Sequence, residues 1–260
     1  MATIHQPGWL VSLEVSSAQL QGDRALQQDC LLVRQDPQAL IVLLADGVGG
    51  HAMGEHAAQL ACFSAMRSLQ WSLRRPMQDL TYAVRASVKA AHTAVSRLQP
   101  AALPGSPPAS TLIAGLFTPR LAQFHVAYVG DSLLYRLHDG ELELLFAPQT
   151  QNGMLVSAVG MLRQRAGGWL PGVQVKGPLD LLPGDSYLFA SDGIGDLSHS
   201  LIKAYLGGPN VRVPCETLAR RAMFKHTVYD VLGEPDKKPQ QDNTSLAIVS
   251  IGAPPAGAQS

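Results

Sequence analysis

The chain has 260 residues, of which 46% are hydrophobic and 15% charged, and its 20 basic and 20 acidic side chains cancel. This composition suits a globular protein with a substantial core, and it gives no general attraction to nucleic acid or to an anionic membrane. No secretory signal pattern opens the sequence, and no apolar run approaches the roughly 20 residues of a membrane-spanning helix, so we expect a cytoplasmic protein.

Three cysteines, Cys30, Cys62 and Cys215, are spread through the chain. Their odd number and wide spacing argue against a disulfide framework, a zinc site or a redox pair. We expect reduced thiols that pack in the core.

Short apolar or alternating runs bounded by turn residues predict strands. In chain order they fall at residues 11–16, 30–34, 39–45, 110–117, 122–129, 133–137, 141–145, 187–190 and 244–251. Asp139-Gly140 lies between two of these runs and is a strong hairpin signal, while residues 182–185 are typical of a turn.

Apolar residues at helical spacing lie between the strand patterns. They predict helices over residues 52–69, 80–98, 201–206 and 217–229. Residues 100–108 are rich in Pro and Gly and predict a loop, and the polar composition of residues 151–177 predicts a flexible surface loop.

The order of these elements indicates the architecture. Strands grouped before and after the helices, instead of strict alternation of strand and helix, indicate an α+β fold with antiparallel sheets. We expect one domain over residues 1–252, followed by a flexible C-terminal tail at residues 253–260.

A lone carboxylate, Asp46, ends the most apolar strand pattern and enters the glycine-dense turn Asp46-Gly47-Val48-Gly49-Gly50-His51. Glycines let the backbone bend tightly enough to bring carbonyl and amide groups toward a metal ion or a phosphate. An ordinary Asp-Gly turn at the end of a strand is the alternative, and such turns are common.

Three later aspartates, Asp131, Asp192 and Asp242, also lie at the edges of predicted strands. Acids gathered near one point repel one another unless cations hold them together, and Mg²⁺ and Mn²⁺ prefer carboxylate and carbonyl oxygens. The repeated pattern therefore predicts a metal site more strongly than four independent turns.

Six motifs follow one another in a fixed order. They are Gly22-x-Arg24 with Gln28-Asp29, Asp46-Gly47-x-Gly49-Gly50-His51, Ser110-Thr111-Leu112, Gly130-Asp131-Ser132, Ser191-Asp192-Gly193-Ile194 and Asp242-Asn243. Together they resemble the metal-dependent protein serine/threonine phosphatases of the PP2C (PPM) class, particularly the compact bacterial members. The resemblance implies a four-layer α-β-β-α sandwich, in which two antiparallel sheets are flanked by helices.

The resemblance also implies a centre with two core ions, Mn²⁺ or Mg²⁺. Asp46 would bridge the two ions, the Gly47 carbonyl would add a ligand to one of them, and Asp192 and Asp242 would hold the other. Two such ions can lower the pKa of a bridging water and aim the resulting hydroxide directly at phosphorus, without a phosphoenzyme.

Other residues take their roles from the same resemblance. Asp131 and Asp196, together with Asp192, would hold a third and weaker ion, although Asp196 also suits a plain helix start. Asp29 would orient the metal-bound water. Arg24, which by itself is typical of a solvated surface charge, would bind the substrate phosphate with its guanidinium fork.

The chain departs from the family pattern at several positions. Val48 stands where animal relatives have a histidine proposed as the general acid, while bacterial relatives keep a histidine at the position of His51, so protonation of the leaving group is unassigned. Leu133 replaces a usual arginine, and Ala147-Pro148-Gln149 replaces a usual Asp-His segment. Residues 151–177 resemble the variable flap of the family.

The implied function is dephosphorylation of phosphoserine and phosphothreonine in a phosphoprotein, reversing a cognate bacterial Ser/Thr kinase in signal transduction. We expect a monomer, and compact relatives include phosphatases of type VI secretion clusters. A catalytically silent phosphatase-like binding module and a metal-dependent hydrolase of small phosphoesters are the alternatives. The residues leave open the phosphoprotein and the choice between Mg²⁺ and Mn²⁺.

Overall fold

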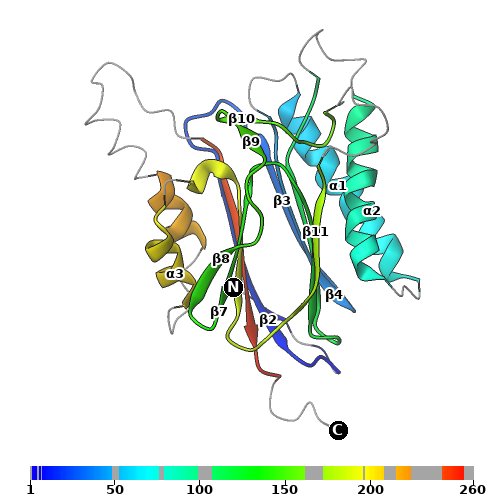
Figure 1. The fold of residues 1–260 in the computed structure, drawn as a ribbon, viewed down its shortest axis with the longest axis vertical. Helices are drawn as coiled ribbons and strands as arrows, with labels where there is room; N and C mark the ends of the chain where they lie inside the picture. The colour runs from blue at the N-terminus through cyan, green and yellow to red at the C-terminus, as the bar shows by residue number, and fades with distance from the viewer. Residues whose placement is uncertain are drawn as a thin grey trace.

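The computed structural model describes residues 2–4, 6, 8–48, 53–75, 79–98, 107–161, 172–195, 197–207, 215–223 and 242–254. Two antiparallel sheets are stacked face to face, and helices cover both outer faces (Figure 1). The predicted α+β fold and its four-layer α-β-β-α arrangement are confirmed.

One sheet has six strands in the order β1-β2-β13-β12-β7-β8. Their bounds are β1 (Ala2–Ile4), β2 (Ser12–Leu20), β7 (Leu133–His138), β8 (Glu141–Leu144), β12 (Ser186–Ala190) and β13 (Thr244–Gly252). Helix α3 (His199–Gly207) and the helical residues 215–223 pack on its outer face (Figure 1). Asp139 and Gly140 both have positive φ in the β7–β8 hairpin, as the Asp-Gly signal predicts.

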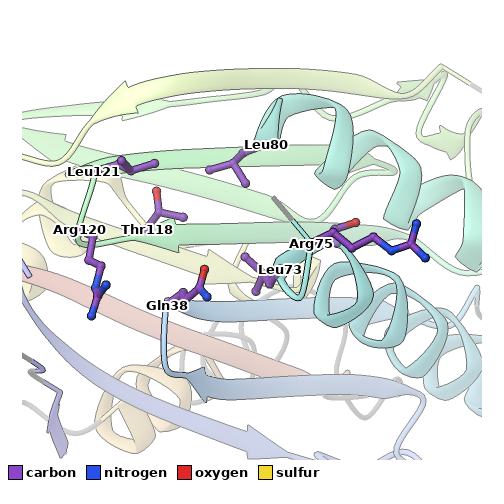
Figure 2. Close-up of a pocket in the computed structure, with 8 residues that line it drawn as sticks. Gln38, Leu73, Arg75, Leu80, Thr118, Arg120 and Leu121 are labelled. Carbon is purple, nitrogen blue, oxygen red and sulfur yellow. The ribbon is translucent and has the colours of Figure 1, made fainter. Parts of the chain in front are cut away.

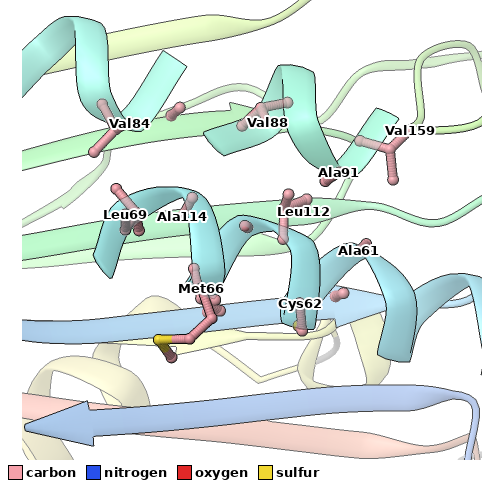
Figure 3. Packing of buried hydrophobic residues seen from close by; sticks show 14 of the residues in the cluster. Ala61, Cys62, Met66, Leu69, Val84, Val88, Ala91, Leu112, Ala114 and Val159 are labelled. Atoms are coloured by element: carbon pink, nitrogen blue, oxygen red, sulfur yellow. The ribbon is translucent and has the colours of Figure 1, made fainter. Parts of the chain in front are cut away.

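The other sheet has five strands in the order β11-β6-β5-β4-β3. Their bounds are β3 (Asp29–Asp36), β4 (Ala39–Asp46), β5 (Leu112–Thr118), β6 (Gln123–Val129) and β11 (Gln174–Asp180). Helices α1 (Gly54–Leu73) and α2 (Leu80–Ser96) cover its outer face (Figure 1). Figure 3 shows their side chains, such as Leu69 and Val88, packed against Leu112 and Ala114 of the sheet.

Strand β4 shows how the sequence produces these layers. All residues from Ala39 to Ala45 are buried, because β4 is covered on both faces. Alternate residues of β4 face opposite layers: one set packs under α1 and α2 and the other set packs between the sheets. Asp46 continues the alternation on the side between the sheets, at the very end of the strand.

The prediction of a flexible loop over residues 151–177 is wrong at both of its ends. Strands β9 (Thr150–Gln151) and β10 (Met154–Leu155) form a small hairpin, and β11 begins within the predicted loop. Strand β11 was not predicted, because the pair Gly177-Pro178 within it is typical of a turn. An edge strand tolerates the missing N–H of proline, and the register of β11 shifts at that point.

Other predictions have partial outcomes. Strand β1 was not predicted. The helix predicted over residues 217–229 is observed to residue 223, and the remainder lies outside the described residues, as do residues 162–171 and 255–260. All three cysteines are buried and free, as predicted. Among the described helices, none has both the length and the apolar character needed to cross a bilayer.

The closest packing between the sheets generates a stability prediction. A Cβ atom at Gly115 of β5 would lie 2.7 Å from Cζ of Phe189 and 3.2 Å from Cε2 of Phe124. Gly115→Ala should therefore lower the free energy of unfolding by roughly 1–3 kcal/mol, measured by urea denaturation. Phe189→Leu removes the opposing ring atoms, so the double variant should lose less stability than the sum of the two single changes. Strictly additive losses would show that the two positions do not compete for space.

Candidate metal centre

Five aspartates at one end of the sandwich lie near enough for their charges to interact, and we call Asp29, Asp46, Asp131, Asp192 and Asp242 the aspartate cluster. Asp29 and Asp46 are directly opposite each other in the β3–β4 pair. The charge of Asp192 acts on Asp29, Asp46 and Asp131, and the charge of Asp242 acts on Asp29 and Asp192. The strand ends thus bring together residues that are far apart in the sequence.

The backbone of Asp46 is fixed by the Ser110-Thr111 pair. The Asp46 amide donates to Oγ1 of Thr111 at 2.9 Å. The Asp46 carbonyl accepts from the Thr111 amide at 2.8 Å and from Oγ of Ser110 at 2.8 Å. These contacts hold the backbone of Asp46, and its carboxylate makes a further hydrogen bond with the side chain of Asp192.

Gly47 lies where two backbone segments approach each other. Its amide donates to the Gln28 carbonyl at 3.0 Å. A Cβ atom at this position would collide with the Gly54 carbonyl oxygen, at the start of α1. Glycine is therefore required here by space, which the sequence motif alone did not explain.

The turn that carries Asp131 is held by Gln149, a residue whose role the sequence did not reveal. The Gly130 amide donates to Oε1 of Gln149 at 3.0 Å, and the Gln149 amide donates to the Gly130 carbonyl at 2.8 Å. Nε2 of Gln149 also donates to the Gly172 carbonyl at 2.6 Å, just before β11. Gln149 belongs to the segment that departs from the usual Asp-His segment of the family. Its side chain thus joins the Asp131 turn to the residues that lead into β11.

Asn243 is a second residue whose role was missed. It is buried, and its Nδ2 donates to the carbonyls of Gln21 at 2.7 Å and Leu26 at 3.2 Å, while its Oδ1 accepts from the Gln28 amide at 2.7 Å. Three bonds from one side chain tie the loop that carries Arg24 to the start of β13. The Asp-Asn motif contained the residue, but no local pattern indicated this contact.

Arg24 and Asp242, predicted for two different roles, form an ion pair. Nη2 of Arg24 donates to Oδ2 of Asp242 at 2.7 Å, and their side chains are 35% and 42% exposed. Oδ1 of Asp242 accepts from the Asn243 amide at 2.8 Å. Both oxygens of this carboxylate are therefore already engaged.

Asp29 is the most buried acid of the cluster, with 5% of its surface exposed. Burial raises its pKa to about 6, and the hydroxyls of Ser245 and Ser191 oppose that rise, while the charges of Asp192 and Asp242 add to it. Neither carboxylate oxygen has a hydrogen-bond partner of good geometry among the described residues. A buried carboxylate without hydrogen-bond partners lowers the stability of the folded state unless a ligand binds to it.

The pKa values of three neighbouring acids, Asp46, Asp131 and Asp192, are raised as well. Burial raises the pKa of Asp46 well above its usual range, with further contributions from the charges of Asp29 and Asp192. Burial and the charge of Asp192 raise the pKa of Asp131 to about 6. Asp192 is an exposed residue, yet burial is still the largest cause of its raised pKa, followed by the charge of Asp242.

The donor chemistry of the cluster fits a hard cation, although the described carboxylates do not surround a single point. A divalent ion stabilises the charged form of acids whose pKa values are raised by burial and then by mutual repulsion, and carboxylate and carbonyl oxygens suit Mg²⁺ or Mn²⁺. In the described part of the chain, no three His, Cys, Asp or Glu side chains converge on one point as a cation site. The predicted site residues Asp196 and His51 lie outside the described residues.

One other histidine has a structural role. His92 of α2 is buried, and its Nδ1 accepts a hydrogen bond from the Gly160 amide at 3.2 Å. Burial lowers the pKa of His92, so the neutral ring is favoured. His92 therefore stabilises the turn at Gly160 in the structure.

Comparison with known proteins gives a family. The sequence model of the family described as Protein phosphatase 2C matches residues 19–220. Serine/threonine protein phosphatase PstP of Mycobacterium tuberculosis is 31% identical over 201 residues, which cover 71% of this chain and 38% of PstP. The chain therefore spans about two fifths of the length of the curated relatives that it matches.

Solved structures extend the similarity to nearly the whole chain. The crystal structure of Mycobacterium tuberculosis PstP/Ppp is 26% identical with a TM-score of 0.69, and the match covers 94% of this chain and 100% of that one. The catalytic domain of PstP in complex with two manganese ions is 25% identical with a TM-score of 0.68, covering 93% and 99%. With a family match over most of its length and this shared fold, the chain belongs to the protein phosphatase 2C family.

Proposed function

We propose that the chain is a metal-dependent protein phosphatase that hydrolyses phosphoserine and phosphothreonine in a phosphoprotein. The observation that carries this proposal is the aspartate cluster beside Arg24, because buried acids that need cations lie next to a guanidinium suited to phosphate. Family membership supports it, as do the name of PstP and the two manganese ions in its catalytic domain.

Four groups would hold the two core ions, Mn²⁺ or Mg²⁺. The Asp46 carboxylate would bridge them, the Gly47 carbonyl would add an oxygen, and Asp192 and Asp242 would complete the set. When bound, such ions lower the pKa of a coordinated water and align it with the phosphorus atom. The Thr111 contacts keep the Asp46 backbone still, which this positioning requires.

Asp29 would orient the attacking water. Its two oxygens are buried and lack partners of good geometry among the described residues, so they can accept hydrogen from a water molecule at the cluster. A pKa of about 6 keeps most Asp29 side chains ionised at neutral pH, as an acceptor must be.

Arg24 would exchange one partner for another during the reaction cycle. Without an ion, its guanidinium pairs with Asp242; once Asp242 binds a cation, the guanidinium is released to the substrate phosphate, where it stabilises negative charge. Asn243 holds the loop on which Arg24 lies, so the side chain stays within reach of both partners.

A third, weaker ion would lie at Asp131 and Asp192, with Asp196 as a further ligand. The mutual repulsion of Asp131 and Asp192 supports this role. A cognate Ser/Thr kinase and a type VI secretion setting remain predictions from the family resemblance. The cytoplasmic location expected from the sequence and the monomeric state also remain predictions.

The first test is metal dependence of hydrolysis. Phosphothreonine peptide hydrolysis should require added Mn²⁺ or Mg²⁺ and stop with EDTA, and Asp46→Asn should lose nearly all activity because the bridging charge is gone. A parallel panel of nucleotides and small phosphoesters tests the alternative hydrolase. No turnover of any substrate, together with normal metal binding, would favour the silent binding module.

Arg24→Ala separates phosphate binding from metal binding. It should raise KM for a phosphopeptide by roughly 10- to 100-fold, since a charge-assisted contact to phosphate is lost. Metal affinity should stay equal or tighten by up to about fivefold, because Asp242 no longer has a competing partner. Calorimetry with Mn²⁺ measures the second effect. Weaker metal binding in this variant would show that Arg24 supports the ions instead of competing with them.

Asp29→Asn should stabilise the metal-free protein. The pKa of Asp29 is about 6 when folded against an ordinary 3.8, so the folded state holds the proton more tightly. The metal-free protein should therefore lose stability as pH rises from about 4 through about 6. At pH near 7 the variant should unfold with a free energy higher by roughly 1–3 kcal/mol, measured by denaturation in EDTA. Equal pH dependence of the wild type and the variant would contradict this assignment.

A further inference from the structure

Two of the three cysteines meet where α1 packs on the five-stranded sheet. Cys30 lies near the start of β3, and Cys62 lies on α1 within the core that the helix covers (Figure 3). Sγ of Cys62 donates to the Cys30 carbonyl at 3.4 Å, and the two thiol groups also hydrogen-bond to each other. The two residues are 32 positions apart, so the sequence contains no redox motif and only the fold brings them together.

The two thiols have different environments. Cys30 keeps 8% of its surface exposed, whereas Cys62 keeps none. The hydrogen bond from Cys62 lowers the pKa of Cys30, against the opposing effects of burial and of the Asp29 charge, and the thiolate is the reactive form of cysteine. Burial raises the pKa of Cys62 well above its usual range. Cys30 is therefore the thiol that a small oxidant meets first, with a second thiol directly behind it.

We propose that Cys30 and Cys62 form a peroxide-responsive dithiol, which closes to a disulfide between β3 and α1. Thiols in hydrogen-bond contact lie close enough to reach the S–S length of about 2 Å through side-chain rotation and a small backbone shift. Redox-sensing cysteines generally combine a partly accessible thiolate with a neighbouring resolving thiol. The inference does not depend on the proposed hydrolysis, because the new bond is measured directly.

The oxidation has two steps, and hydrogen peroxide is the oxidant. The Cys30 sulfur, having lost its proton, attacks one peroxide oxygen; the O–O bond breaks, hydroxide leaves with that proton as water, and Cys30 becomes a sulfenic acid. The Cys62 sulfur then attacks the Cys30 sulfur, the S–O bond breaks, and hydroxide leaves with the Cys62 proton as a second water. The two thiols lose two electrons, which reduce one peroxide to two waters.

The oxidant has to reach the pair at Cys30, because the pocket on the other part of α1 is too far away. That pocket has a volume of about 260 Å³ and lies at the end of α1, where Leu73 and Leu80 are among its walls (Figure 2). Leu73 is separated from Cys62 by about 16 Å along the helix. None of the described residues that line the pocket is a cysteine.

The disulfide would enclose the segment that carries Asp46. Cys30 is directly opposite Ala45 in the β3–β4 pair, and Cys62 lies on the helix that begins at Gly54. The bond therefore joins the chain before the Asp46 turn to the chain after it. Since a disulfide restricts the unfolded chain, the oxidised protein should unfold at a higher urea concentration than the reduced protein.

The test treats the reduced full chain with hydrogen peroxide, blocks the remaining thiols with N-ethylmaleimide in denaturant, and maps the peptides by mass spectrometry. The expected product is a Cys30–Cys62 cross-linked peptide, two hydrogen atoms lighter than the two reduced peptides together, which dithiothreitol removes. Cys215 is the internal control, because it is just as buried and its Sγ donates to the Ser16 carbonyl at 3.1 Å. It should still be blocked by N-ethylmaleimide when the cross-link is complete.

Alanine variants assign the two steps. Cys62→Ala should leave Cys30 as a sulfenic acid, which dimedone traps in roughly tenfold greater yield than in the wild type, where Cys62 consumes it. Cys30→Ala should leave Cys62 unmodified. Cys215→Ala is the matched control and should form the cross-link at the wild-type rate. Circular dichroism checks that each variant is folded, and the wild-type peptide map decides the main point without any variant.

Several outcomes would overturn the proposal. If N-ethylmaleimide still blocks both Cys30 and Cys62 after peroxide treatment, or if a cross-link forms only once urea has unfolded the chain, the folded protein has no such dithiol. Oxidation of Cys215 at the same rate would reduce the effect to general thiol oxidation. Equal dimedone labelling of Cys62→Ala and the wild type would remove the role of Cys62, and a lower urea midpoint after oxidation would contradict the stabilising cross-link.

Discussion

The repulsion among the acids of the aspartate cluster is the constraint on which the rest of the site depends. Burial and neighbouring charges raise the pKa values of Asp29, Asp46, Asp131 and Asp192 together. Such an arrangement persists only if the surrounding structure is stable enough to hold it, so the metal-free centre costs stability that other parts of the fold must offset. In our proposal, cations stabilise the centre when they bind, because they neutralise the acids, and they also activate the attacking water.

The layers hold the cluster because each contributing strand end is fixed from two sides. Strand β4 is buried on both faces, and the Ser110-Thr111 pair secures the backbone of its last residue, Asp46. Asn243 fixes the Arg24 loop with three hydrogen bonds, and Gln149 fixes the turn before Asp131. These contacts use backbone groups and uncharged side chains, so none of them occupies a carboxylate oxygen of the cluster.

The ion pair between Arg24 and Asp242 connects metal binding with substrate binding in the proposed cycle. In that cycle, the guanidinium and a cation would compete for the Asp242 carboxylate, which pairs with Arg24 in the structure.

The sequence by itself indicated the α+β class and most of the strands and helices, because hydrophobic periodicity is a local signal. The order of six motifs indicated the family, and the resemblance to that family implied the layer order. The sequence also predicted which aspartates lie at strand ends, although their roles as ligands remain proposals. Strand β11 escaped prediction because Gly177-Pro178 is typical of a turn, and only its edge position makes a strand possible there. The contacts of Asn243 with the Arg24 loop, the pairing of Arg24 with Asp242 and the pocket at the end of α1 were decided by tertiary structure alone. They join segments as much as 222 residues apart, and no local pattern encodes which distant strand ends and turns become neighbours when the sheets stack.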